Sequence, residues 1–382
     1  MNAVENQQFF SRSLLEWYLV HRRDLPWRRH RNPYYIWVSE IMLQQTRVET
    51  VKPYFQRFIE KFPTIEALAD APEDEVLKAW EGLGYYSRAR NLQSAVREVK
   101  ESYGGVVPDT KEEVSALKGV GPYTTGAILS IAYNKPVPAV DGNVMRVLSR
   151  YFLIEEDIMK VSTRVRMENL VSELFPEGHA GDFTQALMEL GALVCTPKSP
   201  HCLTCPVMEH CAGRLEGKEE SLPIKKKAKP PRPEARLAAL IRGSGERAGQ
   251  FLIRQRPETG LLARMWELPH VLSPEPAYAV SGGGAGADAL EAALAAEAGL
   301  RLQPLHWLME AEHTFSHIHW NMGVYVCELA PGLPGAAGAA SRSAERSLPA
   351  DYVWVDAHTW REYAFPNVFL RIISRYLEDS GA

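Results

Sequence analysis

The sequence predicts a two-domain protein in which an all-α domain is followed by a mixed α/β domain. Its 382 residues are more than one ordinary hydrophobic core organises, so two domains are expected. Apolar residues recur at helical spacing from residue 9 to about residue 190. The segment 216–234 is charged, rich in proline and nearly free of apolar residues, which is typical of a linker. We therefore expect domains at 1–215 and 235–382.

The helices of the first domain are expected where apolar residues return every three or four positions. The segment 36–62 follows this spacing through Trp37, Ile41, Val48, Val51, Phe55, Phe58 and Ile59. Pro63 and Thr64 then begin another helix. Short turns with glycine or proline separate the further helices, which are expected at 75–80, 89–103, 111–117, 124–132 and 143–151.

The second domain mixes strand and helix patterns, which predicts an α/β or α+β fold. Strands are expected at 236–241, 251–254, 324–329 and 352–355, and helices at 289–298 and 369–377. Loops rich in glycine and alanine are expected at 281–287 and 330–347. Cys327 lies in a strand-like run and is interpreted as a buried thiol without a special role.

Charge and composition limit the function classes. The net charge of −4 does not by itself indicate a nucleic-acid binder. His21–Arg31 carries five arginines against one aspartate, which on charge alone favours a solvated basic loop. The arginines around Trp27 also suit phosphates and stacked bases. No apolar run is long enough to cross a bilayer, and Met1–Phe10 lacks the apolar core of a signal peptide.

Four of the five cysteines lie in one short loop: Cys195, Cys202, Cys205 and Cys211, spaced C-x6-C-x2-C-x5-C. Four thiolates at these intervals can surround one soft metal centre. Structural zinc and an iron–sulfur cluster both accept four thiolates, so spacing leaves the two open. The absence of paired CxxC motifs speaks against a zinc ribbon. Thiols kept for metal imply a reducing compartment, hence a cytoplasmic, nucleoid-associated protein.

The segment Leu117–Thr124 (LKGVGPYT) is expected to form a hairpin between two helices. Gly119 and Gly121 permit a tight turn with exposed N–H groups, and Pro122 suits the first position of the next helix. Such a turn can bind a phosphate without reading base sequence, or it can be an ordinary connection. A dinucleotide-binding interpretation fails because no strand precedes the glycines.

Asp141, in Val140–Val144 (VDGNV), taken alone is best interpreted as the N-cap of the helix near Asn143. Together with the hairpin and the cysteine loop it gains weight as a functional residue. The combination of LKGVGPYT, VDGN and C-x6-C-x2-C-x5-C resembles the endonuclease III superfamily of helix-hairpin-helix DNA glycosylases. That resemblance covers the first domain and implies a [4Fe–4S] cluster rather than zinc.

Within this superfamily the chain resembles the adenine DNA glycosylase (MutY) branch. Residues 37–46 (WVSEIMLQQT) are similar to the catalytic helix of that branch. Tyr123 stands where bifunctional relatives carry a Schiff-base lysine, and the C-terminal domain resembles the Nudix-like domain that reads 8-oxoguanine. The implied activity is monofunctional excision of adenine from A:8-oxoG or A:G mispairs in duplex DNA by a monomer.

The chemistry requires two carboxyl groups with opposite duties. Adenine is a poor leaving group until it is protonated, and the sugar then acquires a positive charge. Glu40 taken alone is best interpreted as a surface glutamate. Partial burial beside Trp37 would suit it to the neutral acid, and Asp141 at a helix N-terminus suits the anion. By resemblance Glu40 protonates adenine N7 and later assists water, while Asp141 stabilises the cationic sugar. The resemblance places Tyr123 and Asn143 beside them.

The resemblance also implies DNA contacts. Arg28 and Gln185 correspond to residues that touch the extruded adenine, and Gln44 and Tyr86 to residues that wedge into the duplex. Gln185 also has a plainer interpretation, that of an exposed helix amide. Without an amine at position 123 we expect no efficient strand cleavage.

The second domain is expected to bind without hydrolysing nucleotides. A Nudix hydrolase holds magnesium with the glutamates of its signature helix; aligning Gly299 and Leu300 with the end of that motif leaves only Glu297. Phe315, Ser316 and His317 are similar to the family's 8-oxoguanine-sensing loop, where Ser316 could address the N7–H and O8 edge.

Three other functions are considered. One is an endonuclease III-like glycosylase and lyase for oxidised pyrimidines, which Tyr123 disfavours. Another is a non-catalytic iron–sulfur DNA sensor, which the presence of both Glu40 and Asp141 disfavours. The last is a nucleotide pyrophosphatase, which the degraded Nudix helix disfavours.

Overall fold

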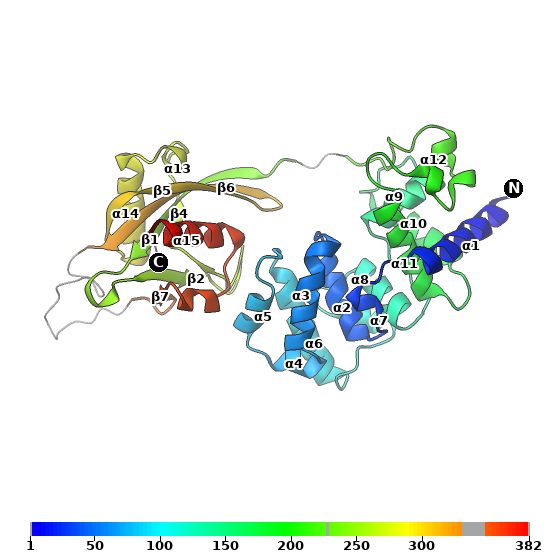
Figure 1. Ribbon diagram of the computed structural model, residues 1–382, viewed down its shortest axis with the longest axis horizontal. Coiled ribbons are helices and arrows are strands. Elements are labelled where there is room, and N and C mark those ends of the chain that lie inside the picture. The colour runs from blue at the N-terminus through cyan, green and yellow to red at the C-terminus, as the bar shows by residue number, and fades with distance from the viewer. Residues whose placement is uncertain (1, 227–228, 331–347, 381–382) are drawn as a thin grey trace. The chain divides into compact units, whose positions relative to one another are not determined.

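The computed structural model describes residues 2–226, 229–330 and 348–380, and it divides into two compact units (Figure 1). The first unit comprises 1–71 and 88–228, and the second comprises 72–87 and 229–382. The second unit therefore includes a short N-terminal segment that the predicted boundaries place in the first domain. The predicted loop at 330–347 lies, except for Ala330, outside the described residues.

The first unit is helical, as predicted. Its longer helices are α1 (Ala3–His21), α2 (Pro33–Leu43), α3 (Val48–Lys61), α4 (Ile65–Asp70), α6 (Ser87–Ser102), α7 (Lys111–Ala116), α8 (Pro122–Ala127), α9 (Gly142–Tyr151), α10 (Val161–Leu174) and α11 (Ala180–Leu193). Short turns complete it: η1 (Pro26–Arg28), the π-helical η2 (Ile128–Ala132), η3 (Cys202–Thr204), η4 (Met208–His210) and α12 (Ala212–Leu215). One core cluster joins the buried faces of α1, α9, α10 and α11.

The apolar pattern at 36–62 forms two helices rather than an unbroken one. Helix α2 ends at Leu43 and α3 begins at Val48. Between them Gln45 has φ +57°, a left-handed conformation that a helix cannot continue through. Similarly, the predicted helix at 124–132 is α8 followed by the π-helical turn of η2.

The second unit is a mixed α/β domain. It contains α5 (Glu73–Ala79), β1 (Arg232–Arg242), η5 (Gly245–Arg247), β2 (Gln250–Gln255), β3 (Trp266–Glu267), β4 (His270–Leu272), α13 (Tyr278–Ser281), α14 (Gly284–Ala298), β5 (Leu302–Thr314), β6 (Ile318–Leu329), β7 (Tyr352–Asp356), η6 (Thr359–Glu362) and α15 (Asn367–Ser380). Strand β1 pairs with β6 in parallel, and β6 pairs with β5 antiparallel. Strand β1 also pairs antiparallel with β2 and β4, and β2 with β3 and β7.

The sheet has helices on both faces. Along β1, Leu237, Ala239 and Ile241 join the core cluster that includes Leu290 and Leu294 of α14. The alternate residues Ala238 and Leu240 join the cluster that includes Phe369 and Ile372 of α15. This two-residue alternation is what a strand buried on both sides requires.

The predicted linker is shorter and less isolated than expected. Leu222 is buried, and Arg150 donates from Nε to its carbonyl at 3.0 Å. Strand β1 already begins at Arg232, which pairs with Ile318. The predicted C-terminal strands and helices are present, whereas β3, β4 and β5 are strands that the sequence pattern did not indicate. The predicted loop at 281–287 is wrong in its second half, because α14 already begins at Gly284.

Candidate active site

Helix α2 buries a carboxylic acid. The helix is apolar on nearly all sides, and Glu40 is its one charged residue. Glu40 is only 5% exposed, and the hydroxyl of Tyr123 donates to its Oε2 at 2.5 Å. Burial raises the pKa of Glu40 to about 7, although the Tyr123 hydrogen bond opposes the rise. The carboxyl group is therefore suited to donating a proton near neutral pH.

Asp141 caps the N-terminus of α9, as the sequence predicted. Its Oδ1 accepts from the Val144 amide and its Oδ2 from the Asn143 side chain, both at 2.8 Å. Burial nevertheless raises the pKa of Asp141, while these donors and Arg146 lower it. The carboxylate is thus held by fixed donors in a partly desolvated position.

One cavity of about 1000 Å³ brings the two acids together. Its wall includes nine residues singled out from the sequence: Glu40, Asp141, Tyr123, Asn143, Arg28, Gln44, Gly119, Gly121 and Gln185. The charge of Asp141 also raises the pKa of Glu40, so the two carboxyl groups interact. The arrangement places an acid and an anion beside any one group that binds in the cavity.

Arg28 is held by an acid that the sequence analysis missed. Glu189 accepts from Arg28 at 2.8 Å and 3.0 Å and from Arg23 at 2.8 Å and 2.9 Å. These hydrogen bonds outweigh burial and lower the pKa of Glu189 to about 2. Glu189 lies four residues after Gln185 on α11, and both line the cavity. That spacing was the available signal, because such residues share a helix face.

The two residues predicted to wedge into a duplex are not the exposed ones. Tyr86 is 5% exposed, and its hydroxyl donates to the Phe365 carbonyl at 3.3 Å. Its neighbour Tyr85 is 46% exposed with φ +48°. Gln44 is half-buried and donates to Thr124 at 3.3 Å, whereas Gln45 is exposed. In this conformation Gln45 and Tyr85 are the accessible members of the two pairs.

The hairpin before α8 has the geometry that its glycines predicted. Gly119 has φ +76°, and the Val120 amide donates to the Leu117 carbonyl. Gly121 caps α8, with Pro122 in its first turn. A Cβ on Gly119 would lie 2.7 Å from Asn91 Cβ, whereas one on Gly121 would meet nothing within 4 Å. Gly119 therefore serves the turn, and Gly121 leaves open space beside the helix N-terminus.

We expect alanine at these two glycines to separate folding from the duplex binding that the resemblance implies for this turn. Gly119→Ala should lower the free energy of unfolding by about 1–2 kcal/mol, because it forces a side chain into a left-handed conformation. Gly121→Ala should leave stability unchanged and weaken duplex binding by about tenfold. Chemical denaturation and fluorescence anisotropy with a labelled duplex measure the two effects. Unchanged duplex binding by Gly121→Ala contradicts a phosphate contact at this turn.

The four cysteines line a small cavity of their own, together with Arg150 and Arg214. No three Cys, His, Asp or Glu side chains among the described residues are close enough to hold a single metal ion. Their thiols nevertheless affect one another's pKa, and Arg150 donates to Cys195 Sγ at 3.3 Å. The four thiols line one cavity, and four thiolates are the donor set that an iron–sulfur cluster takes.

A chain of hydrogen bonds connects the cysteine loop to the active site. Arg146 donates from Nε to the Cys195 carbonyl at 2.7 Å and from Nη2 to Asn143 Oδ1 at 2.8 Å. Asn143 in turn donates to Asp141 at 2.8 Å. The position of the catalytic candidate therefore depends on the loop that carries the cysteines.

In the second unit, Phe315, Ser316 and His317 form the tip between β5 and β6. Phe315 is half-buried, whereas Ser316 and His317 are exposed and share a 3.1 Å hydrogen bond. Glu297, the residual Nudix glutamate, lies near the end of α14 and is exposed. That the domain does not hydrolyse nucleotides stays a prediction.

Comparison with known proteins places this geometry in a family. The human adenine DNA glycosylase (Homo sapiens) is 39% identical over 367 residues, covering 83% of this chain and 66% of the relative. The rat enzyme (Rattus norvegicus) is 39% identical over 375 residues, covering 86% of this chain and 72% of the relative. The chain belongs to the adenine DNA glycosylase family. It spans about two thirds of the human family member's length.

Parts of this adenine DNA glycosylase family member also match broader groups. Residues 38–177 match the HhH-GPD superfamily of base excision DNA repair proteins, 195–211 the iron–sulfur binding domain of endonuclease III, and 238–375 the NUDIX domain. A solved thermostable thymine-DNA glycosylase covers 56% of this chain and 98% of its own, with 31% identity and a TM-score of 0.51. The predicted [4Fe–4S] loop and Nudix-like domain are confirmed.

No helix in the described part of the chain has the length and apolar character that crossing a bilayer demands.

We expect the cluster to depend on the loop thiols alone. Purified wild-type chain should be brown, with absorbance near about 400 nm from iron–thiolate bonds. Cys205→Ser should lose the colour and most of the iron, whereas Cys327→Ala, which removes the buried thiol of β6, should keep both. Iron analysis and absorbance spectra measure this. A colourless wild-type protein with one zinc per chain contradicts the assignment.

Proposed function

We propose that this chain removes adenine from A:8-oxoG and A:G mispairs by hydrolysing the N-glycosidic bond, without cutting the strand. The observation that carries the proposal is the shared cavity of Glu40 and Asp141, with the pKa of Glu40 raised to about 7. A base inside a duplex cannot reach such a cavity, so the nucleotide must first leave the stack. A volume of about 1000 Å³ is large enough to receive a nucleoside and water.

The cavity supplies a partner for each charge that develops. Glu40 donates its proton to the adenine ring as the bond between C1′ and N9 breaks, and the bonding electrons leave with the neutral base. The sugar becomes an oxocarbenium ion, which the Asp141 carboxylate stabilises. Water then adds to C1′ and gives its proton to the Glu40 carboxylate, which restores the acid. Arg28, fixed by Glu189, holds the edge of the base.

The residues around the sugar support a monofunctional enzyme. Strand cleavage by a glycosylase of the lyase type needs an amine that forms a Schiff base with C1′. By resemblance Tyr123 stands where that amine would be, and its hydroxyl donates to Glu40. No lysine is among the described residues that line the cavity.

Other residues have supporting roles in this proposal. The exposed Gln45, with its left-handed backbone, takes the wedge role first given to Gln44, because it can enter the space left by the flipped nucleotide. The hairpin amides at Gly119 and Gly121 hold a backbone phosphate. The tip at Phe315, Ser316 and His317 reads 8-oxoguanine on the opposite strand. The four thiolates hold the cluster, which cross-links the loop beside Arg146.

The rate of excision is expected to depend on pH in a bell-shaped manner. Glu40 acts while protonated, so the single-turnover rate should fall above about pH 7 as its proton is lost. At low pH the rate should fall again as Asp141 becomes neutral. Because the Tyr123 hydroxyl lowers the pKa of Glu40, Tyr123→Phe should move the alkaline limb to higher pH. A single-turnover rate that keeps rising from about pH 7 to about pH 9 contradicts this assignment.

A panel of duplexes tests the proposal. Wild-type chain is incubated with duplexes that contain A:8-oxoG, A:G, A:T or thymine glycol, and free base and strand breaks are measured with and without alkali. We expect adenine release from the two mispairs, with breaks only after alkali. Breaks at thymine glycol without alkali would instead favour an endonuclease III-like lyase. No base release from any duplex would favour a non-catalytic DNA sensor.

A further inference from the structure

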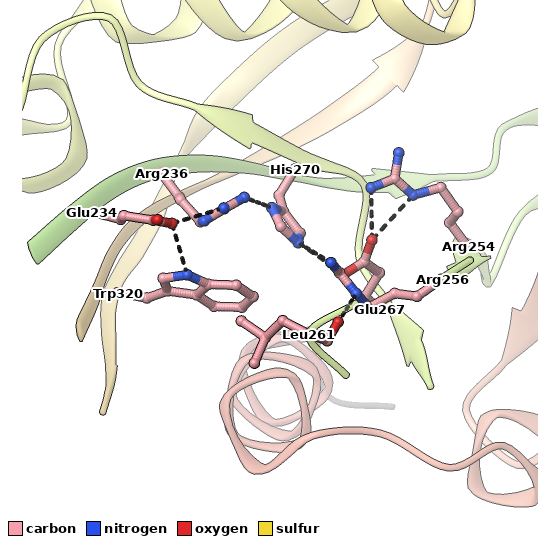
Figure 2. A network of polar contacts seen from close by, with 8 residues as sticks. All are labelled: Glu234, Arg236, Arg254, Arg256, Leu261, Glu267, His270 and Trp320. Carbon is pink, nitrogen blue, oxygen red and sulfur yellow. Dashed lines mark hydrogen bonds and ion pairs between the residues drawn. The ribbon is translucent and has the colours of Figure 1, made fainter. Parts of the chain in front are cut away.

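A connected set of charged and polar side chains lies inside the second unit, and Figure 2 shows it. Its members are Glu234 and Arg236 on β1, Arg254 on β2, Arg256 beyond it, Glu267 on β3, His270 on β4 and Trp320 on β6. The charged side chains of this set are at most 20% exposed. Arg232, which is exposed and lies outside the set, also pairs with Glu234. Buried charges destabilise a fold unless each is paired, so this set needs an explanation.

Glu267 and His270 form the centre of the network. Glu267 accepts from Arg254 and from Arg256 at 2.6 Å each. Arg236 donates to His270 Nδ1 at 3.0 Å, so this nitrogen is the acceptor, and His270 donates from Nε2 to Glu267 at 2.8 Å. Burial lowers the pKa of His270, which agrees with a neutral ring. The imidazole therefore fixes Arg236 in one orientation.

Arg236 in turn fixes Trp320. The Arg236 guanidinium lies 4.5 Å from the centre of the indole ring. Oε2 of Glu234 accepts from Arg236 at 2.8 Å and from Trp320 Nε1 at 3.2 Å. One carboxylate oxygen thus ties the edge of the indole to the cation over its face. The Trp320 side chain is thus held at its edge and over its face, and the residue is fully buried.

The tip between β5 and β6 packs against Trp320. The Phe315 ring packs edge-to-face against Trp320 and His313, with distances between ring centroids of 4.8 Å and 4.5 Å. The backbone of the tip is fixed as well, because the Phe315 amide donates to the Ile318 carbonyl and the Arg232 amide to the His317 carbonyl. Between these anchors, Ser316 stays exposed.

We propose that Trp320, held by Glu234 and Arg236, is a positioning residue that sets the orientation of the Phe315–His317 tip against 8-oxoguanine. The inference rests on the proposed function, since only a chain that reads this lesion has a lesion contact at the tip. Guanine and 8-oxoguanine differ at O8 and at the N7 proton, so one or two hydrogen bonds distinguish them. A displaced tip loses those hydrogen bonds and keeps contacts common to both bases.

The experiment measures discrimination rather than affinity alone. The full chain is titrated with duplexes that contain A:8-oxoG or A:G, in which a 2′-fluorine on the deoxyadenosine prevents cleavage. The discrimination ratio is the dissociation constant for the A:G duplex divided by that for the A:8-oxoG duplex. It is compared for wild type, Trp320→Phe and Arg236→Met. Arg242→Met is the matched control, because Arg242 also lies on β1 and pairs with a glutamate, Glu328, but at the other end of the strand. The control has the same charge change.

We expect Trp320→Phe and Arg236→Met to lower the ratio by about tenfold, the loss of about one hydrogen bond, and Arg242→Met to leave it unchanged. A general loss of stability weakens binding to both duplexes equally, so an unchanged ratio in Trp320→Phe overturns the inference. Adding Phe315→Ala to Trp320→Phe should cause no further loss of ratio, because Trp320 acts through Phe315. Full additivity also overturns it. A wild-type ratio near one overturns the proposed function, and this inference with it.

Discussion

Replacing Glu40 with Gln is expected to lower the single-turnover rate of adenine excision by about a hundredfold to ten-thousandfold, the range attributed to a general acid. Glutamine fills nearly the same space and still accepts from the Tyr123 hydroxyl, so the buried site in α2 should keep its packing. What it cannot do is give a proton to the departing base. Quantifying free adenine at several times after mixing, with enzyme in excess, measures the rate.

Two comparisons make the Glu40 result specific. Glu60→Gln applies the same chemical change to an exposed position on α3 and should leave the rate near wild type. Duplex binding by Glu40→Gln should also stay within a few fold of wild type, because only the proton donor is lost. If Glu40→Gln retains about a tenth or more of the wild-type rate, Glu40 is not the acid.

Asp141→Asn is expected to lower the rate to a similar degree by a different route. Asparagine is as good an N-cap as aspartate, so α9 should keep its start and the Tm should change little. The negative charge that stabilises the cationic sugar is lost. Stabilisation of a developing charge in a desolvated site contributes roughly 3–4 kcal/mol, or about two to three orders of magnitude in rate.

The Asp141 substitution can be compared with a change further along the same hydrogen-bond chain. The hydrogen bonds of Arg146 reach Asp141 through Asn143, and lysine keeps the positive charge near Asp141, so Arg146→Lys should reduce the rate less than Asp141→Asn does. Circular dichroism and thermal melting check that both variants fold. A wild-type excision rate in a well-folded Asp141→Asn variant would contradict the role of the Asp141 carboxylate in stabilising the sugar cation.

Local motifs allowed the fold class and nine of the residues that line the cavity to be predicted. The hairpin glycines, Asp141 and the cysteine loop each depend on a few neighbouring residues, and the structure places them in the expected backbone. The alternation along β1 likewise needs only a strand buried on two faces. Burial of Glu40 could not be predicted from the residue type, because a glutamate on a helix is more often exposed; it follows from a helix whose other side chains are mostly buried and apolar.

Other features depend on tertiary context that a single sequence does not contain. Strand β5 was missed because its pairing with β6 shifts register twice, near Pro304 and near Leu308, which breaks the alternation that marks a strand. Which member of the pairs Gln44–Gln45 and Tyr85–Tyr86 is exposed could not be predicted, because exposure in a loop follows its backbone angles. The role of Glu189 emerges only when η1 and α11 meet.

The central claim, that one adenine leaves the duplex and lies between Glu40 and Asp141, is tested most directly by a crystal structure. The Glu40→Gln variant is crystallised with a duplex that contains A:8-oxoG. We expect the adenine inside the cavity, with residue 40 beside its ring and Asp141 beneath C1′ of its sugar. Adenine still stacked in the duplex, or extruded to a place that Asp141 does not reach, would contradict the account.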